Sequence, residues 1–125
     1  MLTTRILTAT AALALTATAA LAAPPVEMGD TKLGQVLTDM KGMTLYTFDK
    51  DSGDMSACNG GCAAKWPPLL AEAGATADGD YGLIKRDDGA MQWTYDGKPL
   101  YLWINDKAPG DTTGDGVGGV WHAAK

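Results

Sequence analysis

One ten-residue motif occurs twice in the sequence, at a fixed offset of 55 residues. Residues 42–51 read Gly-Met-Thr-Leu-Tyr-Thr-Phe-Asp-Lys-Asp, and residues 97–106 read Gly-Lys-Pro-Leu-Tyr-Leu-Trp-Ile-Asn-Asp. Trp66 and Trp121 stand at the same offset, with no insertion or deletion between the copies. The pattern predicts a single domain (33–125) built from two tandem repeats, about 33–70 and 88–125, joined by a linker at 71–87.

The hydrophobic pattern predicts a mainly β fold made of two hairpins. Alternation favours strands at 33–39 and 43–48 in the first repeat. Around the turn signal Asp96-Gly97 it favours strands at 90–95 and 98–103. Further short strands are expected at 81–86 and 120–125, and only Cys62 to Lys65 offers a short helix, which Pro67-Pro68 ends.

The repeated Leu-Tyr pair explains why two copies are needed. Neighbouring residues of a strand point to opposite faces, so Leu45 and Leu100 lie on aliphatic faces while Tyr46 and Tyr101 lie on aromatic ones. A lone hairpin is marginally stable in water. We therefore expect the two aliphatic faces to pack against each other.

The first 22 residues are typical of a secretory signal peptide. One basic residue, Arg5, precedes an apolar run that ends in Ala20-Leu21-Ala22, a signal-peptidase pattern. Cleavage after Ala22 leaves a flexible arm at 23–32. No cysteine stands near the cut, so no lipid anchor is expected. The apolar run is short and interrupted by threonines, so no membrane span is expected in the mature chain either. The predicted location is periplasmic or secreted, in a bacterium.

The charge balance narrows the possible partners. The net charge is −5, whereas nucleic acids and anionic membranes attract basic proteins. Nucleic acid is therefore excluded as a partner, and an unknown envelope protein or a small ligand is expected.

Cys58 and Cys62 are the only cysteines of the chain. In an exported protein this pair predicts a disulfide. The alternative is a copper or thiol-redox site that uses Cys58, Cys62 and His122, the sole histidine, with Met43 or Met55 as a soft ligand. The Cys-x-x-x-Cys spacing differs from that of disulfide oxidoreductases and of haem attachment.

Two acidic loops follow the repeated phrases. Oxygen ligands of this kind suit calcium, so calcium is a second possible metal. If the loop that begins at Asp111 is aligned with an EF-hand loop, the twelfth position, where a Glu is required, is His122. Asp and Gly residues also shape turns in the absence of a metal. The candidate carboxylates are Asp49, Asp51, Asp54, Asp111 and Asp115. No cofactor is expected on balance.

Two of the repeated aspartates invite a structural interpretation. Asp51 and Asp106 each precede a tryptophan, Trp66 and Trp121, by the same interval. A buried indole N–H needs an acceptor, so we hypothesise an Asp–Trp hydrogen bond within or between the copies. Catalysis has little support, because the sequence has one histidine and no nucleophile or phosphate-binding motif. The chain is not expected to be an enzyme.

Taken together, these residues closely resemble a bacterial family of secreted repeats, or predicted lipoproteins, with a Tyr-x-(Phe/Trp/Tyr)-x-x-Asp motif. The resemblance covers nearly the whole mature chain and departs from the family in lacking a lipobox cysteine. It implies export and the repeat architecture, and it supplies no catalytic residues, since the family is of unknown function. The motif residues are Tyr46, Phe48, Asp51 and Trp66 in the first copy and Tyr101, Trp103, Asp106 and Trp121 in the second.

The sequence thus predicts an exported, non-catalytic binding or structural module. The aromatic faces carrying Tyr46, Phe48, Tyr101 and Trp103 are its expected binding surface, with at least half of that area expected in the core. Copper or thiol chemistry and calcium stabilisation are the alternatives.

Overall fold

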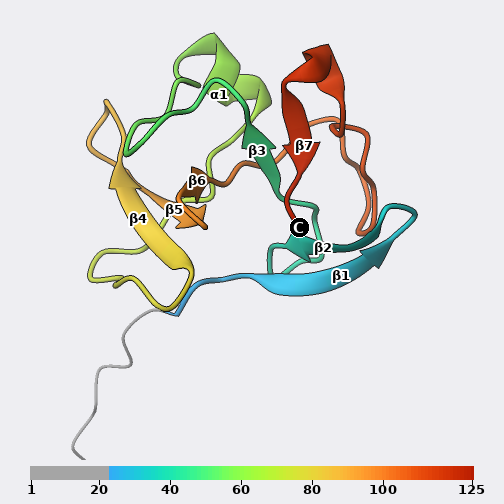
Figure 1. Ribbon diagram of the computed structural model, residues 1–125, viewed down its shortest axis with the longest axis horizontal. Coiled ribbons are helices and arrows are strands. Elements are labelled where there is room, and N and C mark those ends of the chain that lie inside the picture. The colour runs from blue at the N-terminus through green and yellow to red at the C-terminus, as the bar shows by residue number, and fades with distance from the viewer. Residues whose placement is uncertain (1–22) are drawn as a thin grey trace, which may run out of the picture.

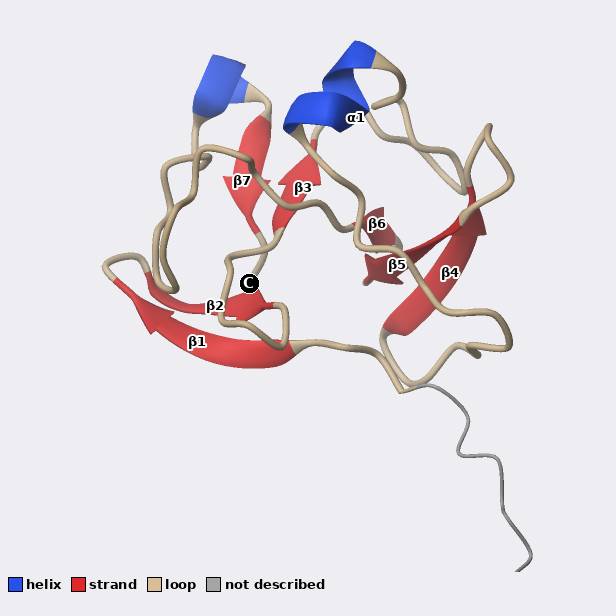
Figure 2. Ribbon diagram, turned by 180° about the vertical axis from the view of Figure 1, so that it is seen from behind, coloured by secondary structure: helices blue, strands red, loops and turns tan. Residues whose placement is uncertain are grey.

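The computed structural model describes residues 23–125, so the predicted signal peptide at 1–22 lies outside the described residues. The described chain is mainly β, as the sequence predicts, with short strands in three small sheets (Figures 1 and 2). The elements are β1 (Glu27–Thr31), β2 (Gly34–Thr38), β3 (Tyr46–Phe48), α1 (Gly61–Lys65), β4 (Tyr81–Lys85), β5 (Met91–Tyr95), β6 (Lys98–Pro99), the 3₁₀ turn η1 (Val117–Gly119) and β7 (Trp121–Ala123).

The first sheet corrects the expected start of the domain. Strand β1 lies in the segment assigned to a flexible arm, and it pairs along its whole length with β2. Its sequence, Glu-Met-Gly-Asp-Thr, has one apolar side chain and no buried residue, so no hydrophobic alternation marks it as a strand. A Cβ on Gly29 would lie 2.6 Å from the Thr38 side chain, so the close approach of the two strands needs glycine there.

The predicted partner of the second strand also differs. β2 touches the segment after it through a single bridge, Thr38 to Thr44, and the backbone bond from Leu45 N to Leu37 O. The segment expected as one long strand at 43–48 is regular only as β3, and β3 pairs with β7 at the far end of the chain.

The second half follows the prediction more closely. β4 and β5 form a five-residue antiparallel pair, and β5 turns back into β6 at Asp96-Gly97. Both turn residues have positive φ, 49° and 76°, as a tight two-residue hairpin turn requires. The expected strand at 98–103 is regular only over Lys98–Pro99. The helix α1 and the last strand β7 fall where the sequence places them.

The two halves meet at the repeated tyrosines. Tyr46 N donates to Tyr101 O at 2.8 Å, and Tyr101 N donates to Tyr46 O at 3.0 Å. On either side of this pair, each half extends a C-terminal segment along the other. Ala124 N donates to Leu45 O, and Leu69 N donates to Leu100 O. The repeats are therefore interlocked about an approximate two-fold axis.

The interlocked halves enclose two adjoining cores. Leu45 and Leu100 are fully buried in one apolar cluster, which confirms the predicted packing of the aliphatic faces. Tyr46 and Tyr101 are equally buried in the other, aromatic cluster. Each Leu-Tyr segment is thus buried on both faces, with its leucine in the apolar cluster and its tyrosine in the aromatic cluster.

Candidate functional site

The repeated tyrosines and aspartates bind each other across the two halves. Tyr46 donates its hydroxyl proton to Asp106 Oδ2 at 2.6 Å, and Tyr101 donates to Asp51 Oδ2 at 2.6 Å. These contacts replace the hypothesised Asp–Trp bonds, because a phenol reaches each carboxylate. The Tyr of each motif copy bonds to the Asp of the other copy, so both residues are needed in both copies.

The remaining bonds of each carboxylate hold a loop. Asp106 Oδ1 accepts from the backbone N–H and the hydroxyl of Thr113, and Asp51 Oδ1 accepts from Ala57 N at 2.7 Å. Burial raises the pKa of Asp51 from its usual 3.8, and the hydrogen bonds from Tyr101 and Ala57 only partly offset this. Each motif aspartate therefore ties a loop of its own half to a tyrosine of the other.

The pKa values of both tyrosines are raised well above 10.0. Burial is the largest cause for Tyr46 and Tyr101, followed by the hydrogen bond to the facing aspartate. Both phenols consequently remain protonated donors at physiological pH. Neither ring is exposed, so both belong to the part of the aromatic area that was expected to lie in the core.

Four aromatic rings stack in one column through the molecule. The order is Phe48, Trp121, Trp66 and Trp103, with ring centroids 4.1, 3.8 and 3.9 Å apart. The two central tryptophans are parallel to within 2° and come from different halves. Tyr46 and Tyr101 meet Trp66 and Trp121 edge-on. The motif aromatics thus form the core between the repeats, and only the terminal rings are partly exposed.

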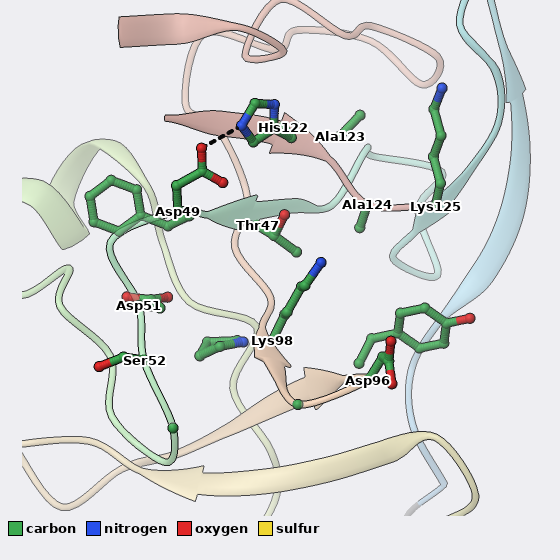
Figure 3. A pocket seen from close by; sticks show the side chains of 15 residues that line it. Thr47, Asp49, Asp51, Ser52, Asp96, Lys98, His122, Ala123, Ala124 and Lys125 are labelled. Carbon is green, nitrogen blue, oxygen red and sulfur yellow. Dashed lines mark hydrogen bonds and ion pairs between the residues drawn. The ribbon is translucent and has the colours of Figure 1, made fainter. Parts of the chain in front are cut away.

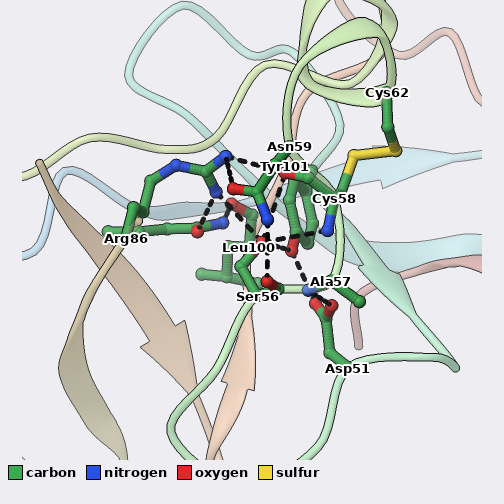
Figure 4. Close-up of a disulfide and its surroundings, with 10 residues drawn as sticks. Asp51, Ser56, Ala57, Cys58, Asn59, Cys62, Arg86, Leu100 and Tyr101 are labelled. Carbon is green, nitrogen blue, oxygen red and sulfur yellow. Dashed lines mark hydrogen bonds between the residues drawn. A yellow bond between two sulfur atoms is a disulfide. The ribbon is translucent and has the colours of Figure 1, made fainter. Parts of the chain in front are cut away.

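The cysteines form the predicted disulfide, Cys58–Cys62. Beside it lies a buried cation that sequence reasoning missed (Figure 4). The Arg86 guanidinium donates to Gln92 Oε1 at 2.6 Å and to Cys58 O at 2.7 Å. It also reaches Ser56 and Asn59. Because Ser56 Oγ lies 2.6 Å from the Tyr101 hydroxyl, this network joins the disulfide loop to the Tyr101–Asp51 pair.

The candidate metal ligands do not converge. The two sulfurs are bonded to each other, and across residues 23–125 no group of three or more His, Cys, Asp or Glu side chains is placed to hold an ion. Asp111 Oδ2 accepts from Lys107 N and Ala108 N, and Asp115 Oδ1 accepts from Ala123 N. The Asp111 carboxylate shapes a turn, and the Asp115 carboxylate ties its loop to β7. Asp54 is exposed.

His122 and Asp49 are in hydrogen-bond contact at the mouth of a hollow. Their Nε2 and Oδ2 atoms lie 2.8 Å apart, and both side chains are about half exposed, at 47% and 54%. The hollow has a volume of about 400 Å³ and lies between the β3–β7 pair and the β5–β6 turn (Figure 3). Lys98 extends its ammonium group into this space, and the Ser52 hydroxyl lies apart from His122 and Asp49.

Most charged or ionisable residues of the hollow differ between the two repeats, whereas Asp51 is shared with Asp106. At the offset of 55 residues, Asp49 corresponds to Ile104 and His122 to Pro67. The backbone is equivalent at these positions, since Asp49 N donates to Val120 O as Ile104 N donates to Lys65 O. The other substituted pairs are Thr47 with Leu102, Lys98 with Met43, Lys125 with Leu70, and Asp96 with Lys41.

A difference in loop packing opens the hollow. In the first half, the turn at Gly42 is covered, because Gly110 N donates to Gly42 O and a Cβ on Gly42 would touch Pro109. Thr44 Oγ1 fastens the same covering loop through Asp111 O at 2.7 Å. In the second half, Gly97 has open space beside it. Pro99 stands where a hydroxyl donor would be needed, so no equivalent bond can hold a loop over this turn.

Position-by-position comparison of the repeats could have found these residues from the sequence. The shared positions form the interlock, whereas Lys98, Lys125 and Asp96 attract notice only as departures from the repeat. A family model describing a secreted repeat of unknown function, Lipoprotein_15, matches residues 28–70 and 82–125. The chain belongs to this family. The two Lipoprotein_15 repeats begin at β1 and β4, several residues before the repeat boundaries predicted from the repeated motif.

No curated protein and no solved structure matches the chain. Among residues 23–125, no helix of this Lipoprotein_15 protein has the length and apolarity needed to cross a bilayer.

Proposed function

We propose that this secreted repeat protein is a non-catalytic binding module of the bacterial envelope, which holds a small polar ligand in the hollow between its halves. The observation that carries the proposal is the divergence of the repeats. Residues that maintain the interlock are shared, whereas four residues of the hollow, Asp49, Lys98, His122 and Lys125, replace the apolar residues Ile104, Met43, Pro67 and Leu70 of the other half. A volume of about 400 Å³ lies within the usual range of small-molecule sites, roughly 300 to 1,000 Å³.

Binding in this proposal requires neither copper nor calcium. The two sulfurs are already joined, and Asp111 and Asp115 accept backbone hydrogen bonds that fix their loops. The histidine is engaged by Asp49 and stands apart from the Ser52 hydroxyl, an arrangement that favours recognition over nucleophilic chemistry. Chelator-treated protein is therefore expected to bind as well as untreated protein.

The test uses substitutions that the fold already accommodates. In the variant Asp49→Ile/Lys98→Met, both residues are copied from the equivalent positions of the other half. The matched control, Ile104→Asp, makes the reverse change outside the hollow. Backbone amide spectra of the mature protein are recorded with mixtures of small polar metabolites. A ligand is expected to shift the amides of Thr47, Asp49 and Gly97 in the wild type and in the control, and to lose this effect in the double variant.

The proposal fails under two results. One is that no mixture shifts the amides that line the hollow. The other is that the double variant responds as the wild type does, since the ligand would then bind elsewhere.

A further inference from the structure

We propose that the hollow binds a short peptide that contains proline, in the way that the chain's own Pro109-Gly110 segment packs on the turn at Gly42. This inference rests on the proposed function, because it names the class of ligand held in the hollow. It follows from the equivalent site of the first half, which the protein itself fills.

The turn at Gly42 shows what such a site accommodates. A Cβ on Gly42 would lie 3.0 Å from Pro109 Cβ, so a proline ring packs directly on the glycine. Gly110 N donates to Gly42 O at 3.4 Å, and Thr44 Oγ1 donates to Asp111 O at 2.7 Å. The covering segment thus presents a proline ring, one N–H and one carbonyl to the turn.

The turn at Gly97 offers a similar glycine with nothing over it. Gly97 stands 55 residues after Gly42, and the two glycines have similar φ, 76° and 82°. Beyond its chain neighbours, no atom lies within 4 Å of a Cβ built on Gly97, and no residue of the described range 23–125 donates a hydrogen bond to Gly97 O. Because Gly97 lines the hollow, its open face and its carbonyl are accessible to a ligand there.

One side-chain difference explains why the second half leaves its turn bare. In the first half, the Asp111 carboxylate accepts two backbone N–H bonds that close the covering turn on itself. Ser56 stands at the equivalent position, and its hydroxyl lies in the interior, 2.6 Å from the Tyr101 hydroxyl and 3.1 Å from the Arg86 guanidinium. The loop before Ser56 is therefore held by the core and stays clear of Gly97.

The lining of the hollow suits a proline-containing peptide. Phe48 and Tyr95 are partly exposed aromatic residues of the lining, and proline-rich segments dock in grooves lined by such rings. Phe48 ends the aromatic column, with Trp121 stacked on one of its faces. Lys98 extends its ammonium group into the hollow (Figure 3), where it can donate to a peptide carbonyl as the Thr44 hydroxyl does in the other half. The volume of about 400 Å³ limits the ligand to a short peptide.

The experiment titrates two blocked, uncharged dipeptides, N-acetyl-prolyl-glycinamide and N-acetyl-alanyl-glycinamide, into the mature protein while backbone amide shifts are followed. We expect the prolyl probe to shift the amides of Thr47, Gly97 and Lys98 with saturation. The alanyl probe should bind about fivefold more weakly, because it lacks most of the apolar ring that the glycine face accepts.

Two substitutions test the contacts. Gly97→Ala puts a methyl group where the proline ring packs and should abolish binding. Its control, Gly34→Ala, places the same group on a turn glycine of similar φ, 89°, that also has open space beside it and lies outside the hollow, so it should bind as the wild type does. Lys98→Met should weaken binding about threefold through the loss of one hydrogen bond. Lys85→Met, an exposed position of β4 outside the hollow, is its control and should leave binding unchanged.

The outcomes separate this inference from the function on which it rests. If the metabolite mixtures shift the lining amides and the prolyl probe does not, the peptide is overturned and the binding function stands. If the alanyl probe binds as tightly as the prolyl probe, the proline contact is overturned and the binding function again stands. Equal binding by Gly97→Ala and Gly34→Ala would also overturn that contact. If neither the probes nor the mixtures shift any amide of the lining, both proposals are overturned.

Discussion

Asp51 and Asp106 occupy equivalent positions in unequal surroundings. Asp106 is 7% exposed and accepts three hydrogen bonds, from Tyr46 and from two donors of Thr113. Asp51 is less deeply buried, accepts two, and lies near the Arg86 guanidinium, which acts to lower its pKa. Burial nevertheless prevails for Asp51, so its carboxyl binds a proton more readily in the folded protein than in the unfolded chain.

This asymmetry predicts a pH effect that Asp51→Asn removes. Because the folded pKa is raised above 3.8, the folded state binds the proton more tightly than the unfolded chain does. The resulting stabilisation is fully present below about pH 3.8, the ordinary pKa of an aspartate. It is lost as the pH rises through the raised value. Denaturant titrations from pH 3.5 to 7 should therefore show wild type losing stability relative to Asp51→Asn across this window. A difference that is constant with pH would contradict the account.

At the scale of elements, the disulfide loop depends on a cation supplied by the other half. Arg86 follows β4 and donates to Ser56, Cys58 O and Asn59, on the loop that leads into α1. The Cys58–Cys62 link closes a small ring and contributes roughly 2 kcal/mol at most. The guanidinium network therefore matters at least as much for the position of this loop.

Arg86→Lys is expected to destabilise the protein by about 2 to 4 kcal/mol, because an ammonium group cannot reproduce the fork of bonds to Gln92 and Cys58 O. Urea unfolding measures the loss. Lys85→Arg, one position earlier and exposed, is the control and should change stability by less than about 0.5 kcal/mol. A loss in Arg86→Lys as small as that of the control would contradict the role of the network.

How far the sequence predicts these elements depends on what fixes each one. The Asp96-Gly97 turn and the helix at α1 are set by local chemistry and could be predicted. The three-residue strands β3 and β7 are paired by the interlock of the halves, which no local pattern contains. From the sequence, Arg86 would be expected on the surface, because the acceptors that allow its burial lie in a loop distant in the chain. The hollow exists because no loop covers Gly97 as one covers Gly42, a difference in packing that no local sequence pattern contains.

At the scale of the whole molecule, neither half completes its own core. β7 of the second half pairs with β3 of the first, and Leu69 of the first half bonds to Leu100 of the second. The stacked pair Trp66–Trp121 also joins the halves. The linker between them, around 71–80, is largely exposed and contains no strand. Cutting there should leave the interlock intact.

Fragments 23–76 and 77–125 are therefore expected to be unfolded when separate and to associate when mixed. Far-ultraviolet circular dichroism and tryptophan fluorescence follow the association, since the column forms only in the complex. A mixture that includes a Trp121→Ala fragment is the control and should associate poorly. Independent folding of either fragment would contradict the interlock.

The central claim is that each repeated tyrosine donates a hydrogen bond to the motif aspartate of the other repeat. Double-mutant cycles on unfolding free energy test it directly, with Tyr→Phe and Asp→Asn changes in all four combinations. We predict coupling of about 1 to 3 kcal/mol for Tyr46 with Asp106 and for Tyr101 with Asp51, the range for hydrogen bonds to a charged group. For Tyr46 with Asp51 and for Tyr101 with Asp106 we predict coupling below about 0.5 kcal/mol. Coupling of equal size within each repeat would contradict the crosswise arrangement.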